Sequence, residues 1–151
     1  MILVVDVGNT HTVIGLYQGK KLTRHWRLLT EAERTADEYG VLLRSLFAAS
    51  DLNFSIIEGL VVSCVVPPMT NVVTELAQKY FRMQPLIVGP GIKTGMPILY
   101  DNPREVGADR IVNAVAAYER FHDVTIVVDF GTATTFDYVT AAGEYLGGAI
   151  V

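Results

Sequence analysis

The sequence has one cysteine, one tryptophan and no run of basic residues. A single cysteine cannot close a disulfide, and Cys64 lies in the apolar run VVSCVV, which favours a small buried hydrophobic residue over a nucleophile. The net charge of −4 argues against a nonspecific nucleic-acid or anionic-membrane surface. The apolar N-terminus MILVVDVG is short, lacks a basic leader and is interrupted by Asp6, so it predicts neither a signal peptide nor a membrane span. We therefore expect a cytoplasmic protein without nucleic-acid or membrane partners.

Charged residues are also scarce, at 19% of a 151-residue chain of which 50% is hydrophobic. Soluble proteins usually have about 25% charged residues, so this deficit suggests that a partner or further sequence covers part of the surface. The length is that of one ordinary globular domain, which should bury about two thirds of the surface that its unfolded chain would expose. Such a core needs no metal or disulfide to stabilise it.

Several common active-site motifs are missing. Neither the phosphate-binding pattern G-x-x-x-x-G-K-[ST] nor the dinucleotide-binding pattern G-x-G-x-x-G occurs. The three histidines, His11, His25 and His122, are too scattered for a metal site built on histidine. Ser55 and Ser63 lack the strand-turn-helix context of a hydrolase nucleophile. Any nucleotide or metal site must therefore be built from other residues.

Short apolar runs alternate with helical patterns along the chain, which predicts an α/β fold. We expect strands at residues 2–7, 12–17, 22–29, 59–65, 85–88, 124–128, 134–139 and from 145, helices at 36–49, from 68 and from 103 to 121, and a functional loop over the glycine- and proline-rich residues 89–100. Thr35 and Glu38 form a capping-box pattern. Asn102 and Glu105 form a second one, which places Gly107 inside the first turns of the third helix.

The opening of the chain is repeated near its end. Asp6-Val7-Gly8-Asn9 aligns with Asp129-Phe130-Gly131-Thr132, and Thr12 aligns with Thr135, at a constant offset of 129 − 6 = 123 residues. Each copy starts a three-strand meander, and the offset is far longer than the period of a solenoid or a propeller. We therefore predict two homologous lobes. Residues 1–121 form the first, with a substrate-side helix at its end, and residues 122–151 form the opening three-strand meander of a second, incomplete lobe.

In both copies an aspartate ends a buried strand beside a glycine turn with hydroxyl or amide side chains. Glycine lets backbone N–H groups approach a phosphate, and the carboxylate can hold a cation or its water shell against it. For one such turn, the ordinary turn preferences of these residues are the better explanation. Two turns at equivalent positions of two lobes instead predict a cleft in which one nucleotide lies with its phosphates facing both.

Three segments carry a family resemblance: DVGNTHT (6–12), DFGTATTFD (129–137) and YDNPREVGADRIVNAVAAY (100–118). The first two resemble the phosphate motifs of the superfamily of acetate and sugar kinases, heat-shock ATPases and actin. The third contains Gly107-Ala108-Asp109-Arg110, which resembles the substrate-side signature of the type III pantothenate kinases. The resemblance implies a duplicated ribonuclease-H-like, actin-like ATPase fold whose second lobe is truncated, so that the chain covers only the N-terminal part of the family's length.

The resemblance also implies roles for individual residues. The ATP phosphates would be lined by Asp6, Val7, Gly8, Asn9, Thr10, His11, Thr12 and Val13, with Thr132 contacting ATP from the second lobe. Mg²⁺ would lie near Asp6, directly or through water, and Asp129 would belong to a site for a monovalent cation, K⁺ or NH₄⁺. Tyr100, Gly107, Ala108, Asp109 and Arg110 would hold pantothenate, and Asp109 would be the general base. The resemblance further implies a homodimer with pantothenate bound near the interface.

The residues themselves allow two interpretations of the helix start. Asp109 could accept the proton of an alcohol, and Arg110 could bind a carboxylate with two hydrogen bonds. Spacing alone favours a solvated helix start with an ordinary surface ion pair. Two further positions stay open, because Asp137 could face a cleft or solvent, and His11 could touch phosphate or be a partly exposed strand residue.

We therefore expect ATP-dependent phosphorylation of pantothenate to 4′-phosphopantothenate, the first step of coenzyme A biosynthesis. One alternative is another small-molecule kinase of the same superfamily, which the two Asp-Gly turns alone would allow. The other is a non-catalytic, regulatory or transcription-linked relative, against which the presence of Asp6, Asp109 and Asp129 argues. If the protein consists of these 151 residues alone, we expect an incomplete nucleotide site, exposed apolar surface and little or no activity without a second chain.

Overall fold

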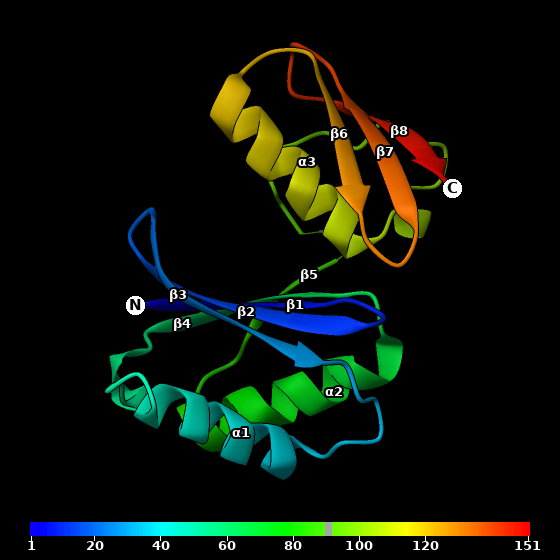
Figure 1. Ribbon diagram of the computed structural model, residues 1–151. Coiled ribbons are helices and arrows are strands. Elements are labelled where there is room, and N and C mark those ends of the chain that lie inside the picture. The colour runs from blue at the N-terminus through cyan, green and yellow to red at the C-terminus, as the bar shows by residue number, and fades with distance from the viewer. Residues whose placement is uncertain (90–91) are drawn as a thin grey trace. The chain divides into compact units, whose positions relative to one another are not determined.

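The computed structural model describes residues 1–89 and 92–151, which form two compact units (Figure 1). The first unit is Met1–Ile87 and the second is Val88–Val151. Residues 90 and 91 of the predicted functional loop lie outside the described residues. Each unit combines helix and sheet, so the predicted α/β class is confirmed. No helix in the described ranges is long and apolar enough to cross a membrane.

A five-stranded sheet in the order β3-β2-β1-β4-β5 organises the first unit. Its strands, each within one residue of its predicted bounds, are β1 (Ile2–Val7), β2 (His11–Gln18), β3 (Lys21–Leu29), β4 (Gly59–Cys64) and β5 (Leu86–Val88). The first three form the predicted antiparallel meander, whereas β4 runs parallel to β1. On one face of the sheet lie α1 (Ala36–Ala48) and α2 (Pro67–Leu76), which a π-helical turn over Ala77–Phe81 continues (Figure 1). A short 3₁₀ turn, Phe54–Ile56, precedes β4.

Alternation along β1 decides which side chains enter the core of this unit. Leu3, Val5 and Val7 are buried in a cluster that includes Phe47 of α1 and Met69 of α2. Because successive side chains of a strand alternate between faces, Asp6 lies on the opposite face of the sheet, where it is exposed. The pattern that builds the core therefore also presents this carboxylate at the end of the strand.

The predicted capping box at the start of α1 is confirmed. The Thr35 N–H donates to Glu38 Oε2 (2.8 Å), and the Glu38 N–H donates to Thr35 Oγ1 (3.3 Å). These two bonds satisfy amides that have no partner within the helix.

We expect Thr35→Ala to lower the free energy of unfolding of the first unit by about 1 kcal/mol, because the Glu38 amide loses its capping oxygen. Ser45→Ala is the matched control, since the Ser45 hydroxyl donates to the Val41 carbonyl inside the same helix and caps neither end. Urea denaturation followed by the fluorescence of Trp26, the single tryptophan, measures both. Equal effects of the two substitutions would contradict the capping role.

In the second unit a three-stranded antiparallel sheet, β6-β7-β8, packs against one long helix. The elements are α3 (Ala108–Phe121), β6 (Thr125–Phe130), β7 (Thr134–Val139) and β8 (Tyr145–Ile150). Ile111 and Ala114 of α3 are buried with Val139 and Tyr145 of the strands. Asp129 is the fifth of six residues in β6, as Asp6 is in β1. The repeated strand-and-turn pattern is therefore confirmed at the level of secondary structure.

The start of the third helix differs from the prediction. Asn102 caps a separate 3₁₀ turn, Pro103–Glu105, and α3 begins only at Ala108. Between them Val106 is extended and buried, which interrupts the helical hydrogen bonding. Gly107 is consequently the residue that precedes α3 as its N-cap, and the expectation that it lies inside the helix is wrong.

The two compact units do not coincide with the two predicted lobes. The units divide between Ile87 and Val88, whereas the predicted lobes divide after residue 121. The difference arises because α3 packs on β6 and β7 and so belongs to the second unit by its contacts. The predicted lobes were defined by the internal repeat, whereas the units are defined by their internal contacts. The division into lobes therefore stays a prediction.

One face of the second sheet is apolar and exposed. Asp129 and Asp137 hydrogen-bond to α3, so the residues that alternate with them lie on the opposite face. The large apolar side chains there, between 39% and 83% exposed, are Ile126, Val128, Phe130, Phe136 and Tyr138. An exposed apolar surface of this kind agrees with the expectation for an incomplete lobe.

Candidate functional site

The turn between β1 and β2 contains the first group of predicted nucleotide-binding residues. The Gly8 N–H donates to the His11 carbonyl (3.0 Å), which closes the turn. This amide is therefore engaged within the turn, so any backbone N–H that binds a phosphate here belongs to another residue of the turn. Of the residues predicted to line the phosphates, Asp6, Asn9, Thr10 and His11 are exposed, Gly8 and Val13 are half-buried, and Val7 and Thr12 are buried.

Thr30, which sequence reasoning did not select, braces this turn from the end of β3. Its hydroxyl donates to the Gly8 carbonyl (2.7 Å), and its N–H donates to the Thr10 carbonyl (2.9 Å). The Thr12 hydroxyl lies 2.9 Å from the Thr30 hydroxyl and donates to it, because the Thr30 proton is already directed to Gly8. The buried Thr12 hydroxyl thus stabilises the turn through Thr30 and does not point into solvent.

Replacing Thr30 with valine should lower the free energy of unfolding of the first unit by about 1–3 kcal/mol, since the Gly8 carbonyl and the Thr12 hydroxyl both lose their partner. Thr23→Val is the matched control on β3, the strand that Thr30 directly follows, because the Thr23 hydroxyl makes one bond, to the Leu16 carbonyl (2.9 Å). Urea denaturation monitored by Trp26 fluorescence compares the two. A loss from Thr30→Val no greater than that from Thr23→Val would contradict the bracing role.

The turn between β6 and β7 occupies the equivalent place in the second unit, but its glycine bonds to the carbonyl two residues on instead of three. The Gly131 N–H donates to the Ala133 carbonyl (3.1 Å), and Thr132 is exposed at the tip. Asp129 is exposed, and its Oδ2 accepts a hydrogen bond from the side-chain amide of Asn113 on α3 (2.9 Å). The other carboxylate oxygen, Oδ1, takes no part in that bond.

Asn113 is a second residue that sequence reasoning missed. It follows Asp109 by four residues, so the two side chains lie one turn apart on the same side of α3. That spacing was visible in the sequence and could have identified Asn113. Through its bond to Asp129, the helix that carries the predicted general base is fixed beside the second turn.

The start of α3 carries the central predicted substrate residues. Ala108 is buried and anchors the first turn, while Asp109 is half-buried. Asp109 Oδ1 accepts a hydrogen bond from the Arg110 N–H (2.8 Å). This bond holds the carboxylate at the N-terminal end of the helix, where the helix dipole favours negative charge.

Arg110 makes a buried ion pair with Asp137 of β7. Nε and Nη2 of Arg110 lie 2.8 Å and 2.6 Å from Asp137 Oδ1, and Asp137 is 1% exposed. Asp137 therefore faces neither a cleft nor solvent, the two positions that the sequence left open. Burial lowers the pKa of the Arg110 guanidinium, but the hydrogen bond and charge of Asp137 outweigh this effect and raise it above its usual value.

The Tyr145 hydroxyl also donates to Asp137 Oδ1 (2.6 Å). Burial, followed by this hydrogen bond to a carboxylate, raises the pKa of Tyr145 far above its usual range. The phenol therefore stays protonated and acts as a donor to Asp137 throughout the neutral range.

Tyr100, the remaining predicted substrate residue, lies at the end of a segment attached to β8. The Tyr145 N–H donates to the Pro97 carbonyl (2.9 Å), and the Leu99 N–H donates to the Tyr145 carbonyl (2.8 Å). The Tyr100 side chain is partly exposed. The second unit thus holds Tyr100, Asp109 and Arg110 on adjoining elements.

The carboxylate of Asp6 fits a magnesium ion whose other ligands are mainly nucleotide phosphates and water. Within residues 1–89 and 92–151, no three His, Cys, Asp or Glu side chains converge into a metal site. Mg²⁺ in kinases needs only one or two carboxylates besides phosphate oxygens and water. Asp6, an exposed carboxylate at a strand end beside a turn, meets that requirement.

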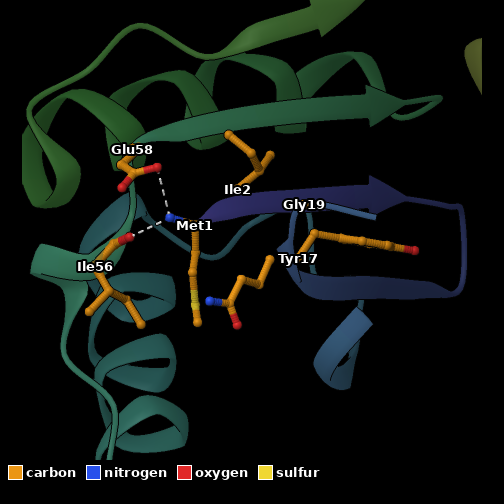
Figure 2. A pocket seen from close by; sticks show the side chains of 7 residues that line it. Met1, Ile2, Tyr17, Gly19, Ile56 and Glu58 are labelled. Carbon is orange, nitrogen blue, oxygen red and sulfur yellow. Dashed lines mark hydrogen bonds and ion pairs between the residues drawn. The ribbon is translucent and has the colours of Figure 1, made fainter. Parts of the chain in front are cut away.

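A hollow in the first unit lies away from these residues. Figure 2 shows it at the beginning of β1, whereas the Asp6–Gly8 turn follows the end of that strand. The Met1 ammonium donates to the Ile56 carbonyl (2.8 Å) and pairs with Glu58 (3.1 Å) there. None of the predicted site residues lines this hollow, so it is separate from the candidate site.

Comparison with curated proteins gives consistent matches over nearly the whole chain. A family model described as type III pantothenate kinase matches residues 2–151. Type III pantothenate kinases of Geobacter sulfurreducens, Pelobacter propionicus and Syntrophus aciditrophicus are 61%, 60% and 59% identical over 150 residues. Each alignment covers 99% of this chain but only 59% of the relative's length.

Solved structures with low sequence identity share the fold of this chain. A putative N-acetylglucosamine kinase from Porphyromonas gingivalis aligns with a TM-score of 0.54 at 14% identity, covering 99% of this chain and 47% of that one. A putative 2-dehydro-3-deoxygalactonokinase from Sinorhizobium meliloti aligns with a TM-score of 0.55 at 11% identity, covering 99% and 53%. The chain therefore has the predicted actin-like ATPase fold, and it covers about half the length of each of these two proteins.

Proposed function

The chain belongs to the type III pantothenate kinase family, and from that premise we propose that the whole protein transfers the terminal phosphoryl group of ATP to pantothenate, yielding 4′-phosphopantothenate for coenzyme A biosynthesis. The relatives' identity of about 60% favours pantothenate over another small-molecule substrate and over a non-catalytic role. The structural observation that carries the proposal is the grouping of Asp109, Arg110 and Asn113 on one helix, with Asn113 bonded to Asp129.

Asp109 is the proposed general base of the reaction. Phosphoryl transfer to a primary alcohol requires a positioned hydroxyl, compensation of the phosphate charge and an acceptor for the hydroxyl proton. Asp109 supplies that acceptor, and its bond to the Arg110 amide fixes the direction of the carboxylate. In a loose transition state the proton leaves late, so orientation of the alcohol contributes more than the basicity of the carboxylate.

Arg110 is the proposed partner of the pantothenate carboxylate. Nε and Nη2 already contact Asp137, whereas Nη1 takes no part in that pair. The end of the guanidinium that bears Nη1 is therefore the part assigned to the substrate. Tyr100, Gly107 and Ala108 complete the proposed substrate contacts, as the family resemblance implies.

The nucleotide is proposed to bind along the first turn, from Asp6 to Val13, and to contact Thr132. Mg²⁺ near Asp6 would neutralise charge that develops on the transferred phosphoryl group. Asp129 is proposed to belong to a site for K⁺ or NH₄⁺. We also propose that the whole protein is a homodimer, as the family resemblance implies, and that it acts in the cytoplasm.

An ADP-release assay on the whole protein tests this function. We expect release with ATP, Mg²⁺ and pantothenate, and faster release when K⁺ is added. Pantetheine, glucose and acetate in place of pantothenate serve as alternative acceptors. Preference for glucose or acetate would assign the protein to another small-molecule kinase activity, and no pantothenate-dependent release would overturn the proposal.

A further inference from the structure

Tyr145, the first residue of β8, links two stretches of chain that carry proposed substrate residues. Its backbone N–H and C=O bond to Pro97 and Leu99, which fixes the segment leading into Tyr100. Its hydroxyl reaches the other way and donates to Asp137 Oδ1 (2.6 Å). Tyr145 is fully buried, so neither its ring nor its hydroxyl can touch a substrate directly.

Asp137 bonds to both Tyr145 and Arg110 and so connects the two residues. Its Oδ1 accepts from Nε and Nη2 of Arg110 and from the Tyr145 hydroxyl, while its buried Oδ2 has no partner within the described residues. All three donors thus converge on one oxygen, which fixes both the position and the plane of the guanidinium. The Asp137 charge also compensates an arginine whose side chain is only 12% exposed.

Gly147 and Gly148 of β8 leave room for the side chains of Tyr100 and Arg110. Gly147 has a φ of +119°, and a β-carbon there would lie 2.8 Å from the Tyr100 ring. A β-carbon on Gly148 would overlap the Phe136 carbonyl and lie 2.6 Å from Arg110 Nη2. Two successive positions without a side chain therefore let Tyr100 and Arg110 approach the strand backbone.

We propose that Asp137 and Tyr145 are positioning residues for the pantothenate site, which hold Arg110 and Tyr100 in a fixed relation before the substrate arrives. The inference rests on the proposed function. Both residues act through others, because both are buried, whereas Tyr100 is exposed and Arg110 is partly exposed. The entropy lost in fixing the arginine side chain is then lost on folding rather than on binding, which lowers KM for pantothenate.

Tyr145→Phe and Asp137→Asn in the whole protein test the inference. Tyr145→Phe keeps the buried ring and removes only the hydroxyl, so it serves even if Asp137→Asn fails to fold. For each variant we expect KM for pantothenate to rise about tenfold, with kcat and KM for ATP within about twofold of wild type. Tyr138→Phe is the matched control, because Tyr138 lies on the exposed face of β7, and it should leave KM unchanged.

A double-mutant cycle separates positioning from general stability. If Asp137 acts through Arg110, then adding Asp137→Asn to Arg110→Gln should raise KM for pantothenate by less than about twofold beyond Arg110→Gln alone. Effects that multiply would overturn the inference, as would equal increases in KM for ATP and pantothenate or an unchanged KM in both single variants. Absence of turnover by the wild-type protein would instead overturn the proposed function and this inference with it.

Discussion

Asp109→Asn should reduce kcat for pantothenate phosphorylation by about 10²- to 10⁴-fold while leaving the fold intact. Asparagine has the same shape, and its side-chain oxygen can still accept the bond from the Arg110 N–H that the structure shows at 2.8 Å. It cannot accept the hydroxyl proton of the substrate. The loss should therefore appear in kcat, measured by ADP release from the whole protein, with an unchanged melting temperature.

Asp123→Asn is the matched control for this experiment. Asp123 Oδ1 accepts a bond from the N–H of the next residue, Val124 (2.7 Å), which is the same local contact that Asp109 makes. Asp123 is exposed between α3 and β6 and has no proposed role. Near-normal turnover by Asp109→Asn, or an equal loss from Asp123→Asn, would show that Asp109 is not the general base.

The second large effect concerns stability. Asp137→Leu should destabilise the second unit by about 3–5 kcal/mol, because it leaves the Arg110 guanidinium partly buried without its counter-charge. The triple variant Arg110→Met, Asp137→Leu and Tyr145→Phe should recover most of that loss, since it removes the charge and the buried hydroxyl together. Recovery would show that the pair contributes orientation more than net stability.

The two units allow an internal control for this measurement. The single tryptophan, Trp26, stacks on Phe47 in the first unit, so its fluorescence should report no change in that unit. Amide hydrogen exchange of α3 and β7, followed by mass spectrometry, reports the second unit. Asp37→Asn, which breaks an exposed pair with Lys79 (2.7 Å), should leave both probes nearly unchanged. Equal protection of α3 in wild type and Asp137→Leu would contradict the prediction.

Local patterns predicted most of the secondary structure. β1 and the Thr35–Glu38 capping box follow from apolar alternation and from a four-residue motif, and both lie where they were expected. The two meanders were predicted from short apolar runs and turn residues, and the repeat places Asp6 and Asp129 at equivalent positions of their strands. The interruption before α3 was missed, since the burial of Val106 depends on the rest of the unit.

The supporting residues of the candidate site were harder to predict for the same reason. Thr30 reaches Gly8 across 22 positions, and Arg110 reaches Asp137 across 27, so no local pattern identifies either contact. The family resemblance placed Arg110 among the substrate residues, but no sequence pattern indicated that two of its nitrogens already bond to Asp137. Only the fold shows which functional groups remain for a ligand.

The most direct test of the central claim is the detection of the product itself. The whole protein is incubated with ATP, Mg²⁺, K⁺ and pantothenate, and the pantothenate is analysed by phosphorus NMR and mass spectrometry. The account predicts a phosphate monoester on the primary alcohol of pantothenate, formed in equal amount with ADP. ATP consumption that does not depend on pantothenate, or pantothenate recovered without phosphate, would contradict it.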